Sequence, residues 1–187
     1  LTVLPTGQVL VTSGSQGTEP NTTPVYAAEL WNPGTETWAT LAAAQMARTY
    51  HGTGLLLPDG RVLVAGSGGC CGAPDQYNAE IFSPPYLFAG ARPQIDAAPT
   101  EIGYGSPFVV ETGEAASIAR VALIRPAAVT HTTNMEQRYV PLAFTPSGNT
   151  LTVTAPAQGN IAPPGYYMLF IVDANGVPSV AAWVRLS

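Results

Sequence analysis

The sequence predicts an all-β protein built from two different β modules. Of its 187 residues, 46% are apolar and only 10% are charged, and the chain contains 19 glycines and 18 prolines. Glycine and proline at this density interrupt helices but are typical of the turns between short strands. A repeated motif in the first half of the chain and evenly spaced apolar runs in the second half indicate the same fold class.

The first module is marked by an internal repeat. The run LPTGQVLVTSGS from Leu4 matches LPDGRVLVAGSG from Leu57, and AELWNP from Ala28 matches AEIFSP from Ala79. The copies lie about 50 residues apart, which is the period of kelch repeats in β-propellers. Residues between the copies also follow the order of the kelch pattern. They are Trp38, Leu41, Met46, Arg48 and His51.

Each copy is expected to form neighbouring strands of one propeller blade. The VLV runs are predicted to be short strands buried on both faces, each entered through a tight turn at Gly7 or Gly60 that tolerates positive φ. The AELWNP and AEIFSP runs are the next strands out, and Pro33 or Pro84 ends each ladder because proline lacks an N–H. Residues 1–84 are therefore interpreted as the last blades of a kelch propeller.

This first module is too short to close a propeller ring. Residues 1–84 hold fewer than two blades, whereas propellers close with about four to eight. An open ring would expose unpaired strand edges. The hypothesis is that the chain is a truncation or a processed product, or that a partner completes it. The remaining blades, from the same precursor or from a partner chain, are the expected protein partner.

The second module begins after the run SPPYLFAGARP, whose residues 85–91 are predicted to be a linker. Residues 92–187 contain short apolar runs separated by turn signals such as Gly148-Asn149 and Asn175-Gly176. Six or seven strands in this length predict an immunoglobulin-like β-sandwich. The runs are SPFVVET, IARVALIRP, RYVPLAF, TLTVTAP, GYYMLFIVD and VAAWVRL.

Charge and hydropathy exclude two classes of partner. Seven arginines, no lysines and twelve acidic residues give a net charge of −5, so no basic patch is available for nucleic acid. The sequence contains no run of about 18 consecutive apolar residues, so no transmembrane segment is predicted.

The beginning of the sequence bears on processing. Leu1 begins within a predicted strand, which indicates that a signal peptide was removed or that the chain was cut. The low charge and a glycosylation sequon at Asn21 favour a secreted, extracellular protein.

The only two cysteines, Cys70 and Cys71, are adjacent in the sequence. This excludes a disulfide framework that would join distant parts of the fold. A vicinal disulfide would be strained, because adjacent Cα atoms lie about 3.8 Å apart whereas bridged cysteines usually lie about 4.4 to 6.8 Å apart. Both a vicinal bridge and two free thiols are left open.

The only two histidines, His51 and His131, fall in different predicted modules. A single histidine is most often a surface or hydrogen-bonded residue. However, His51 lies at the predicted inner strand of a blade, which lines the central channel in propellers. His131 lies in a polar loop between strands of the sandwich. If the two imidazoles meet, they form a site suited to Cu, Zn, Fe or Ni.

Tyr50 precedes His51, and neighbouring side chains of a regular strand point to opposite faces. Both residues can therefore contact one metal only if the strand is irregular there. The alternative is that Tyr50 is an ordinary core or interface tyrosine.

Several motifs together resemble the galactose oxidase and glyoxal oxidase family of copper radical oxidases, nearly from end to end. They are RTYH followed by LLLPDGRV, a glycine loop with cysteine, AEIFSPPYL, THTxNxxQRxxPL, PPGYYMLF and GVPSVA. The resemblance implies a copper ion held by Tyr50 as the axial ligand and by His51 and His131. It also implies that Tyr50 acts as the general base of the reaction.

The resemblance further implies that a second tyrosine, cross-linked to a cysteine, completes the site and forms a tyrosyl radical cofactor. That pair belongs to earlier blades, so it is absent from this chain, and the 187 residues alone are predicted to be inactive. Cys70 and Cys71 fall where relatives carry a close-spaced disulfide. Polar residues around His131 either fix its loop and tautomer or make ordinary turns. They are Thr130, Thr132, Asn134 and Gln137.

The implied activity is the oxidation of a primary alcohol or aldehyde, on a small molecule or a carbohydrate, by O2 to give H2O2. The alternative is a non-catalytic carbohydrate-binding or cell-surface β module. That alternative requires a solvent-facing platform of aromatic side chains for sugar stacking. The candidates are Tyr86, Phe88, Tyr104, Tyr166, Tyr167 and Trp183.

Overall fold

The structure is a computed structural model that describes residues 1–16, 23–70, 72–131 and 133–187. Three residues named above lie outside this described part, namely Asn21 of the sequon, Cys71 and Thr132. The described residues form strands, turns and two short 3₁₀ helices, so the predicted all-β fold class is confirmed. No described helix is long and apolar enough to cross a membrane.

The chain divides into two compact units. The first contains residues 1–57, 61–83 and 127–137, and the second contains residues 58–60, 84–126 and 138–187. The segment 127–137, which precedes a strand of the second unit in sequence, thus belongs to the first unit. This assignment places both histidines of the chain in the same unit.

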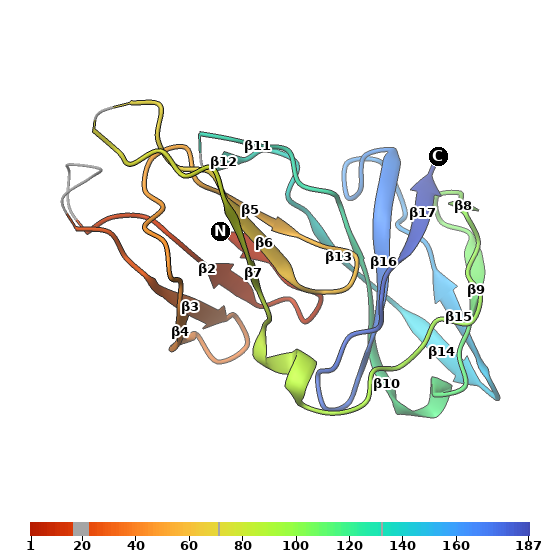
Figure 1. Ribbon diagram of the computed structural model, residues 1–187. Helices are drawn as coiled ribbons and strands as arrows, with labels where there is room; N and C mark the ends of the chain where they lie inside the picture. The colour runs from red at the N-terminus through yellow and green to blue at the C-terminus, as the bar shows by residue number, and fades with distance from the viewer. Residues whose placement is uncertain (17–22, 71, 132) are drawn as a thin grey trace. The chain divides into compact units, whose positions relative to one another are not determined.

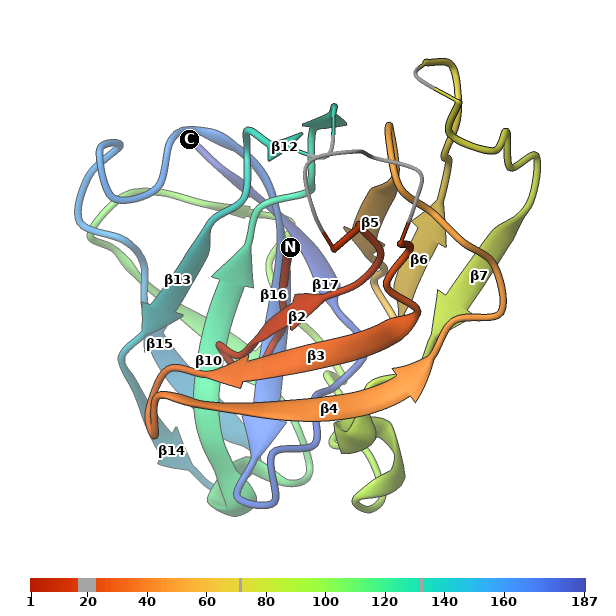
Figure 2. The same cartoon turned by 90° about the vertical axis from the view of Figure 1, so that its left-hand side faces the viewer.

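The first unit contains a four-stranded antiparallel meander with the order β1-β2-β3-β4 (Figure 2). Its strands are β1 (Thr2–Val3), β2 (Val9–Val11), β3 (Ala27–Asn32) and β4 (Thr37–Ala43). A three-stranded meander and a two-stranded ladder complete the unit (Figure 1). They consist of β5 (Thr53–Leu56), β6 (Val62–Ala65) and β7 (Ala79–Phe82), and of β11 (Val129–Thr130) and β12 (Thr133–Asn134).

The repeat has the predicted strand order and turns. Gly7 and Gly60 have φ values of 81° and 82°, the left-handed region that glycine tolerates. Both strands that were expected to stop before a proline do so: β3 ends at Asn32, before Pro33, and β7 ends at Phe82, before Pro84.

The prediction that the VLV strands are buried on both faces was wrong. In β2 and β6 the burial alternates: Leu10, Val62 and Val64 are buried, whereas their neighbours Val9 and Leu63 are only half-buried. Side chains of a strand alternate between faces. In these meanders, therefore, one face of each strand carries the core and the other is only partly covered.

The second unit is a β-sandwich, as predicted for the C-terminal half. One sheet has the order β13-β10-β16-β17-β8 and the other has the order β14-β15-β9. The first sheet contains β8 (Glu101–Ile102), β10 (Ile118–Ile124), β13 (Tyr139–Leu142), β16 (Gly165–Asp173) and β17 (Ala182–Leu186). The second contains β9 (Pro107–Glu111), β14 (Phe144–Ser147) and β15 (Thr150–Thr154). A short 3₁₀ helix, η2 (Ala115–Ser117), precedes β10.

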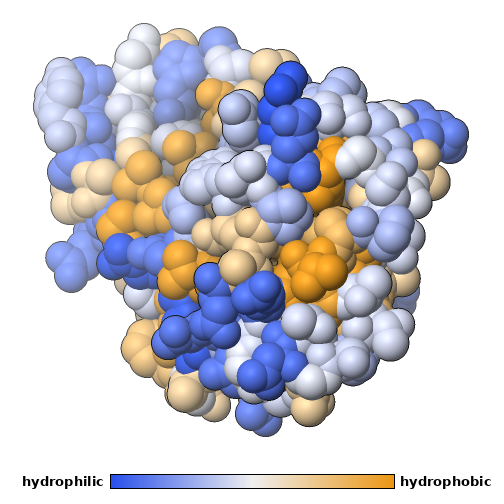
Figure 3. All heavy atoms as spheres, turned by 90° about the vertical axis from the view of Figure 1, so that its right-hand side faces the viewer, coloured by the Kyte–Doolittle hydropathy of each residue, from blue (hydrophilic) through white to orange (hydrophobic). Residues whose placement is uncertain are grey.

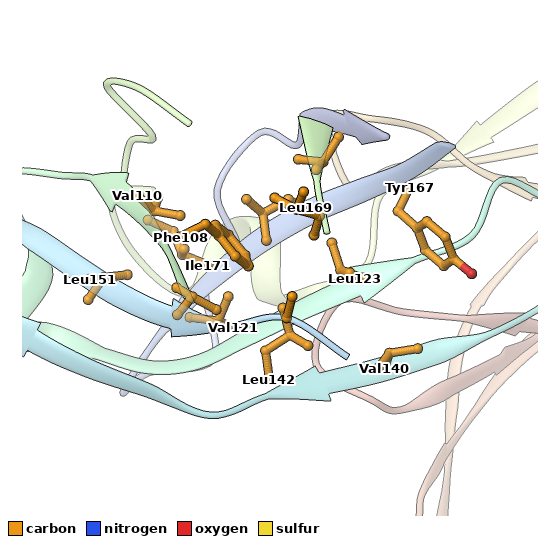
Figure 4. Close-up of a cluster of buried hydrophobic side chains, with 14 of the residues drawn as sticks. Phe108, Val110, Val121, Leu123, Val140, Leu142, Leu151, Tyr167, Leu169 and Ile171 are labelled. Atoms are coloured by element: carbon orange, nitrogen blue, oxygen red, sulfur yellow. The ribbon is translucent and has the colours of Figure 1, made fainter. Parts of the chain in front are cut away.

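The core of the sandwich lies between its two sheets (Figure 4). Leu123 on β10 pairs with Leu169 on β16, and both are fully buried together with Leu151 on β15. Burying one such side chain contributes about 1.5 to 3 kcal/mol. Because the core is made of alternate positions on strands from both sheets, register and hydrophobic pattern stabilise the same arrangement.

The segment predicted as a linker contains a 3₁₀ helix, η1 (Pro85–Phe88), with Tyr86 buried. The Tyr86 hydroxyl donates a hydrogen bond to the carbonyl of Gly60. Arg92 donates to the carbonyl of Asp59 at 2.7 Å and to the carbonyls of residues 178–179. These bonds, all within the second unit, hold the 58–60 turn in place. Burial raises the pKa of Tyr86, an effect that the charge of Arg92 partly offsets.

Substituting Tyr86→Phe is expected to make stability less sensitive to alkaline pH. A raised folded-state pKa means that the native state keeps its proton while the unfolded tyrosine ionises above about pH 10. The contribution of Tyr86 is thus complete below that pH and is lost above it. Melting temperatures measured from neutral pH to pH 11 should fall more steeply for the wild type. An equally steep fall in the variant would contradict the assignment.

Candidate metal centre

The structure brings the two predicted histidines together within the first unit. His51 lies in a turn two residues before β5, and His131 lies at the turn that joins β11 to β12. Both have left-handed backbones, with φ of 57° and 51°. Their ring centroids are 4.7 Å apart and the rings meet edge to face at 77°. Residues from distant parts of the sequence therefore form one imidazole pair.

Tyr50 lies beside this pair, because its ring contacts the ring of His51, the next residue in the chain. Its ring centroid lies 4.0 Å from that of His51, with an angle of 36° between the ring planes. We predicted that Tyr50 and His51 share a face only if the strand is irregular. The structure places neither residue in a strand, because β5 begins at Thr53. The positive φ of His51 breaks the alternation that would separate the two side chains.

Each imidazole has a defined partner at Nδ1. The Nδ1 of His51 lies 3.1 Å from the carbonyl oxygen of Gly68, and the Nδ1 of His131 lies 2.8 Å from the hydroxyl oxygen of Thr130. A carbonyl can only accept, so neutral His51 carries its proton on Nδ1 and its lone pair on Nε2. Metal-binding histidines are commonly oriented by such a bond from the other ring nitrogen.

A glycine-rich loop, which the sequence interpretation named only as one motif of the family resemblance, positions His51. Residues 66–69 all have positive φ, with values of 75°, 129°, 110° and 80°. A Cβ at Gly66 would lie 2.6 Å from the backbone oxygen of His51, and one at Gly69 would lie 3.2 Å from its Nδ1. Glycine is thus required both by the backbone conformation and by the close approach to His51. The GSGG run was the available signal.

The polar residues predicted around His131 occupy defined places in its loop. Thr130 contacts the ring directly. The side-chain oxygen of Asn134 accepts from the backbone N–H of Ala128 at 3.1 Å. Gln137 accepts from the N–H of Val3 at 2.8 Å, which joins the loop to β1. Thr132 lies outside the described residues.

The cysteines are only partly described. Cys70 is disulfide-bonded, whereas Cys71 lies outside the described residues. The vicinal bridge, one of the two alternatives that the sequence left open, therefore stays a prediction.

The donor set fits copper by its chemistry. Across the described ranges, no group of three or more His, Cys, Asp or Glu side chains is placed to hold a metal. The available donors are two imidazoles and one phenol, and nitrogen with oxygen ligands suits Cu(II). The two rings lie at the surface, so the ligand atoms are accessible from outside the core.

Comparisons with known proteins show which family the chain resembles. The model of the galactose oxidase-like early set domain matches residues 92–186, and that of the glyoxal oxidase N-terminus matches residues 1–86. The chain is 37% identical to a galactose oxidase from Gibberella zeae, over 99% of this chain and 28% of that protein. It is 38% identical to an aldehyde oxidase from Vitis pseudoreticulata, over 100% of this chain and 40% of that protein.

A solved structure is similar over the whole chain. A fungal alcohol oxidase of the AA5 family, in complex with copper, matches with a TM-score of 0.89 and 31% identity, over 100% of this chain and 41% of that one. The chain therefore spans well under half the length of these relatives. With both family models matched in order, the chain belongs to the galactose oxidase and glyoxal oxidase-like family of copper radical oxidases.

Proposed function

We propose that this chain forms part of a copper radical oxidase and supplies three ligands of its copper ion, Tyr50, His51 and His131. The observation that carries the proposal is the imidazole pair, with ring centroids 4.7 Å apart. The copper complex of the similar fungal alcohol oxidase supports the choice of metal. The names of the relatives support a primary alcohol or aldehyde as substrate.

The side chains of this chain would divide the work as follows. His51 and His131 offer their Nε2 atoms to the metal, because Nδ1 of each ring is engaged by Gly68 or Thr130. The Tyr50 oxygen accepts the proton of the substrate hydroxyl, which requires hydrogen-bond reach of about 2.6 to 3.2 Å. Copper, when bound, supplies one-electron redox chemistry. Overall, the substrate loses two electrons and two protons, and O2 gains them to become H2O2.

We further propose that the second redox centre of the complete protein lies outside this chain. A tyrosine cross-linked to cysteine, carried by further blades of the same precursor or of a partner chain, would provide the second redox centre. The protein is proposed to be secreted, because its charge is low and it carries a glycosylation sequon. A close-spaced disulfide at Cys70 and Cys71 would stand beside the site.

The structure gives little support to the alternative function of a carbohydrate-binding module. Of the six aromatic residues that it requires, Tyr86 and Tyr167 are buried, and Tyr104 is only partly exposed. Phe88, Tyr166 and Trp183 are exposed. On the face shown in Figure 3, hydrophobic residues lie in several patches among hydrophilic ones. The six residues therefore do not form one stacking platform.

Peroxide production tests the proposal. The complete protein loaded with copper is expected to release H2O2 from a primary alcohol or an aldehyde, as measured by a coupled peroxidase assay. The 187-residue chain, which lacks the radical tyrosine, is expected to release none above the level of free copper. Peroxide formation by the isolated chain would contradict the proposed division of the site. A complete protein that neither binds copper nor forms peroxide would refute the function itself.

A further inference from the structure

A buried arginine, Arg48, joins the two ends of the glycine-rich loop. We call the point where these two ends meet the neck of the loop. The ladder between β6 and β7 ends at the pair Ala65 and Ala79, and residues 66–78 form the loop that joins the two strands. At the first positions beyond the ladder, Nη1 of Arg48 donates to the carbonyls of Gly66 at 2.9 Å and Asn78 at 3.1 Å. One guanidinium nitrogen thus joins both stems of the loop.

Further contacts fix the plane of this guanidinium. Nη2 of Arg48 donates to the side-chain oxygen of Asn78. Nε lies 3.4 Å from a carboxylate oxygen of Glu80, whose other oxygen accepts from the N–H of Gln45 at 2.8 Å. The planar fork of arginine can make all these contacts together, whereas an ammonium group cannot.

The burial of Arg48 is energetically costly unless its contacts compensate for the loss of water. Within the described part of the chain it is the only charged residue that is buried, with 1% of its surface exposed. Removing a guanidinium from water costs several kcal/mol unless hydrogen bonds and an opposite charge compensate. An apolar side chain would fill the same volume without this cost. The geometry that the arginine imposes on the loop is therefore its distinctive contribution.

The loop that Arg48 closes is the one that holds His51. The N–H of Gly68 donates to the carbonyl of Tyr50 at 3.0 Å, and the N–H of Thr49 donates to the hydroxyl of Ser67 at 3.1 Å. The Gly68 carbonyl then receives Nδ1–H of His51. Residues 48–51 and the loop are thus connected by a continuous set of hydrogen bonds that runs from the buried arginine to the imidazole.

We propose that Arg48 is a positioning residue of the metal centre. By holding the neck of the 66–78 loop, it keeps the Gly68 carbonyl against Nδ1 of His51 and so leaves Nε2 as the metal-binding nitrogen. This inference rests on the proposed copper function. Its first consequence, the tautomer of His51, exists without metal and can be measured separately.

The test uses Arg48→Lys in the complete protein, with Arg185→Lys as the matched control because the Arg185 side chain is 54% exposed. Nitrogen-15 NMR of the metal-free protein, at a pH where both imidazoles are neutral, reports which ring nitrogen carries the proton. We expect His51 to be in the Nδ1–H form in the wild type and in the control. In Arg48→Lys we expect a mixture of tautomers, with the His131 signals unchanged.

Copper titration provides the second measurement. A lost orienting bond typically weakens metal binding about 10- to 100-fold, so the Cu(II) dissociation constant of Arg48→Lys should rise within that range. The dissociation constant of Arg185→Lys should stay at the wild-type value. If Arg48→Lys fails to fold, Asn78→Ala, which removes the acceptor of Nη2 and leaves both carbonyl bonds, is expected to shift the tautomer in the same direction.

The outcomes separate the two proposals. If the tautomer of His51 and the copper affinity of the folded variant both equal those of the wild type, the role of Arg48 is refuted. If the tautomer shifts but the wild-type protein binds no copper, the positioning role stands and the copper function fails. A shift in both measurements supports both.

Discussion

Replacing His131 with alanine is expected to remove copper from the complete protein. His131 supplies one of the two imidazoles, and the other ligands proposed in this chain, Tyr50 and His51, are sequence neighbours on one turn. Without His131, one of the two nitrogen donors is missing from the square base of nitrogen and oxygen ligands that suits Cu(II). Copper content, measured after dialysis against a weak chelator, should fall to background, while circular dichroism stays that of a folded β protein.

Thr130→Val is the graded control for this experiment. It removes the hydroxyl that lies 2.8 Å from Nδ1 of His131 but leaves the imidazole in place. Copper should still bind, with an affinity about 10- to 100-fold lower. If His131→Ala retains the full copper content, His131 is not a ligand, and the assignment of the site must be abandoned.

Gly68→Ala is expected to damage both the fold of the loop and the metal centre. The added Cβ would lie 2.0 Å from a carboxylate oxygen of Asp75 and 2.7 Å from its Cα, so the backbone itself must move. Gly68 also has φ of 110°, which L residues rarely adopt. Strain and displacement together should cost about 3 to 5 kcal/mol of unfolding free energy. Copper affinity should fall as the Gly68 carbonyl leaves His51.

Gly14→Ala isolates the contribution of the backbone. Gly14 has nearly the same φ, 107°, but no heavy atom lies within 4 Å of its added Cβ. This variant should lose only about 1 to 2 kcal/mol and should bind copper normally. Chemical denaturation and copper titration of the two variants, side by side, check the comparison. Equal losses in both would show that the contact with Asp75 has no effect.

Much of the fold could be predicted because local chemistry specifies it. The turns at Gly7 and Gly60 need positive φ, and the runs that follow them have strand character, so their order was evident in the sequence. In β15, Leu151 and Val153 alternate with threonines, and these two apolar residues are the buried ones. The burial of β2 and β6 was wrongly predicted, because a short apolar run does not show how many of its faces will be covered.

The candidate site could be predicted less completely. Tyr50, His51 and His131 were recognised as candidate ligands from motifs. The alternation of side chains along a strand also predicted that Tyr50 and His51 can share a metal only where the strand is irregular. It did not indicate that a positive φ at His51 meets this condition. Nor did it show that Arg48 and Gly68 support the imidazole, because the carbonyl of Gly68 has no sequence signature of its own.

The sequence alone thus determined the all-β class and the repeated strand order of the first module, and its family resemblance proposed the ligand types. Only the tertiary structure decided that the two imidazoles lie 4.7 Å apart and that Nδ1 of each ring has a hydrogen-bond partner. The physical reason is the range of the forces involved. Strand and turn preferences act over a few residues, whereas the meeting of residues 51 and 131 depends on how the 127–137 segment folds back onto the first unit.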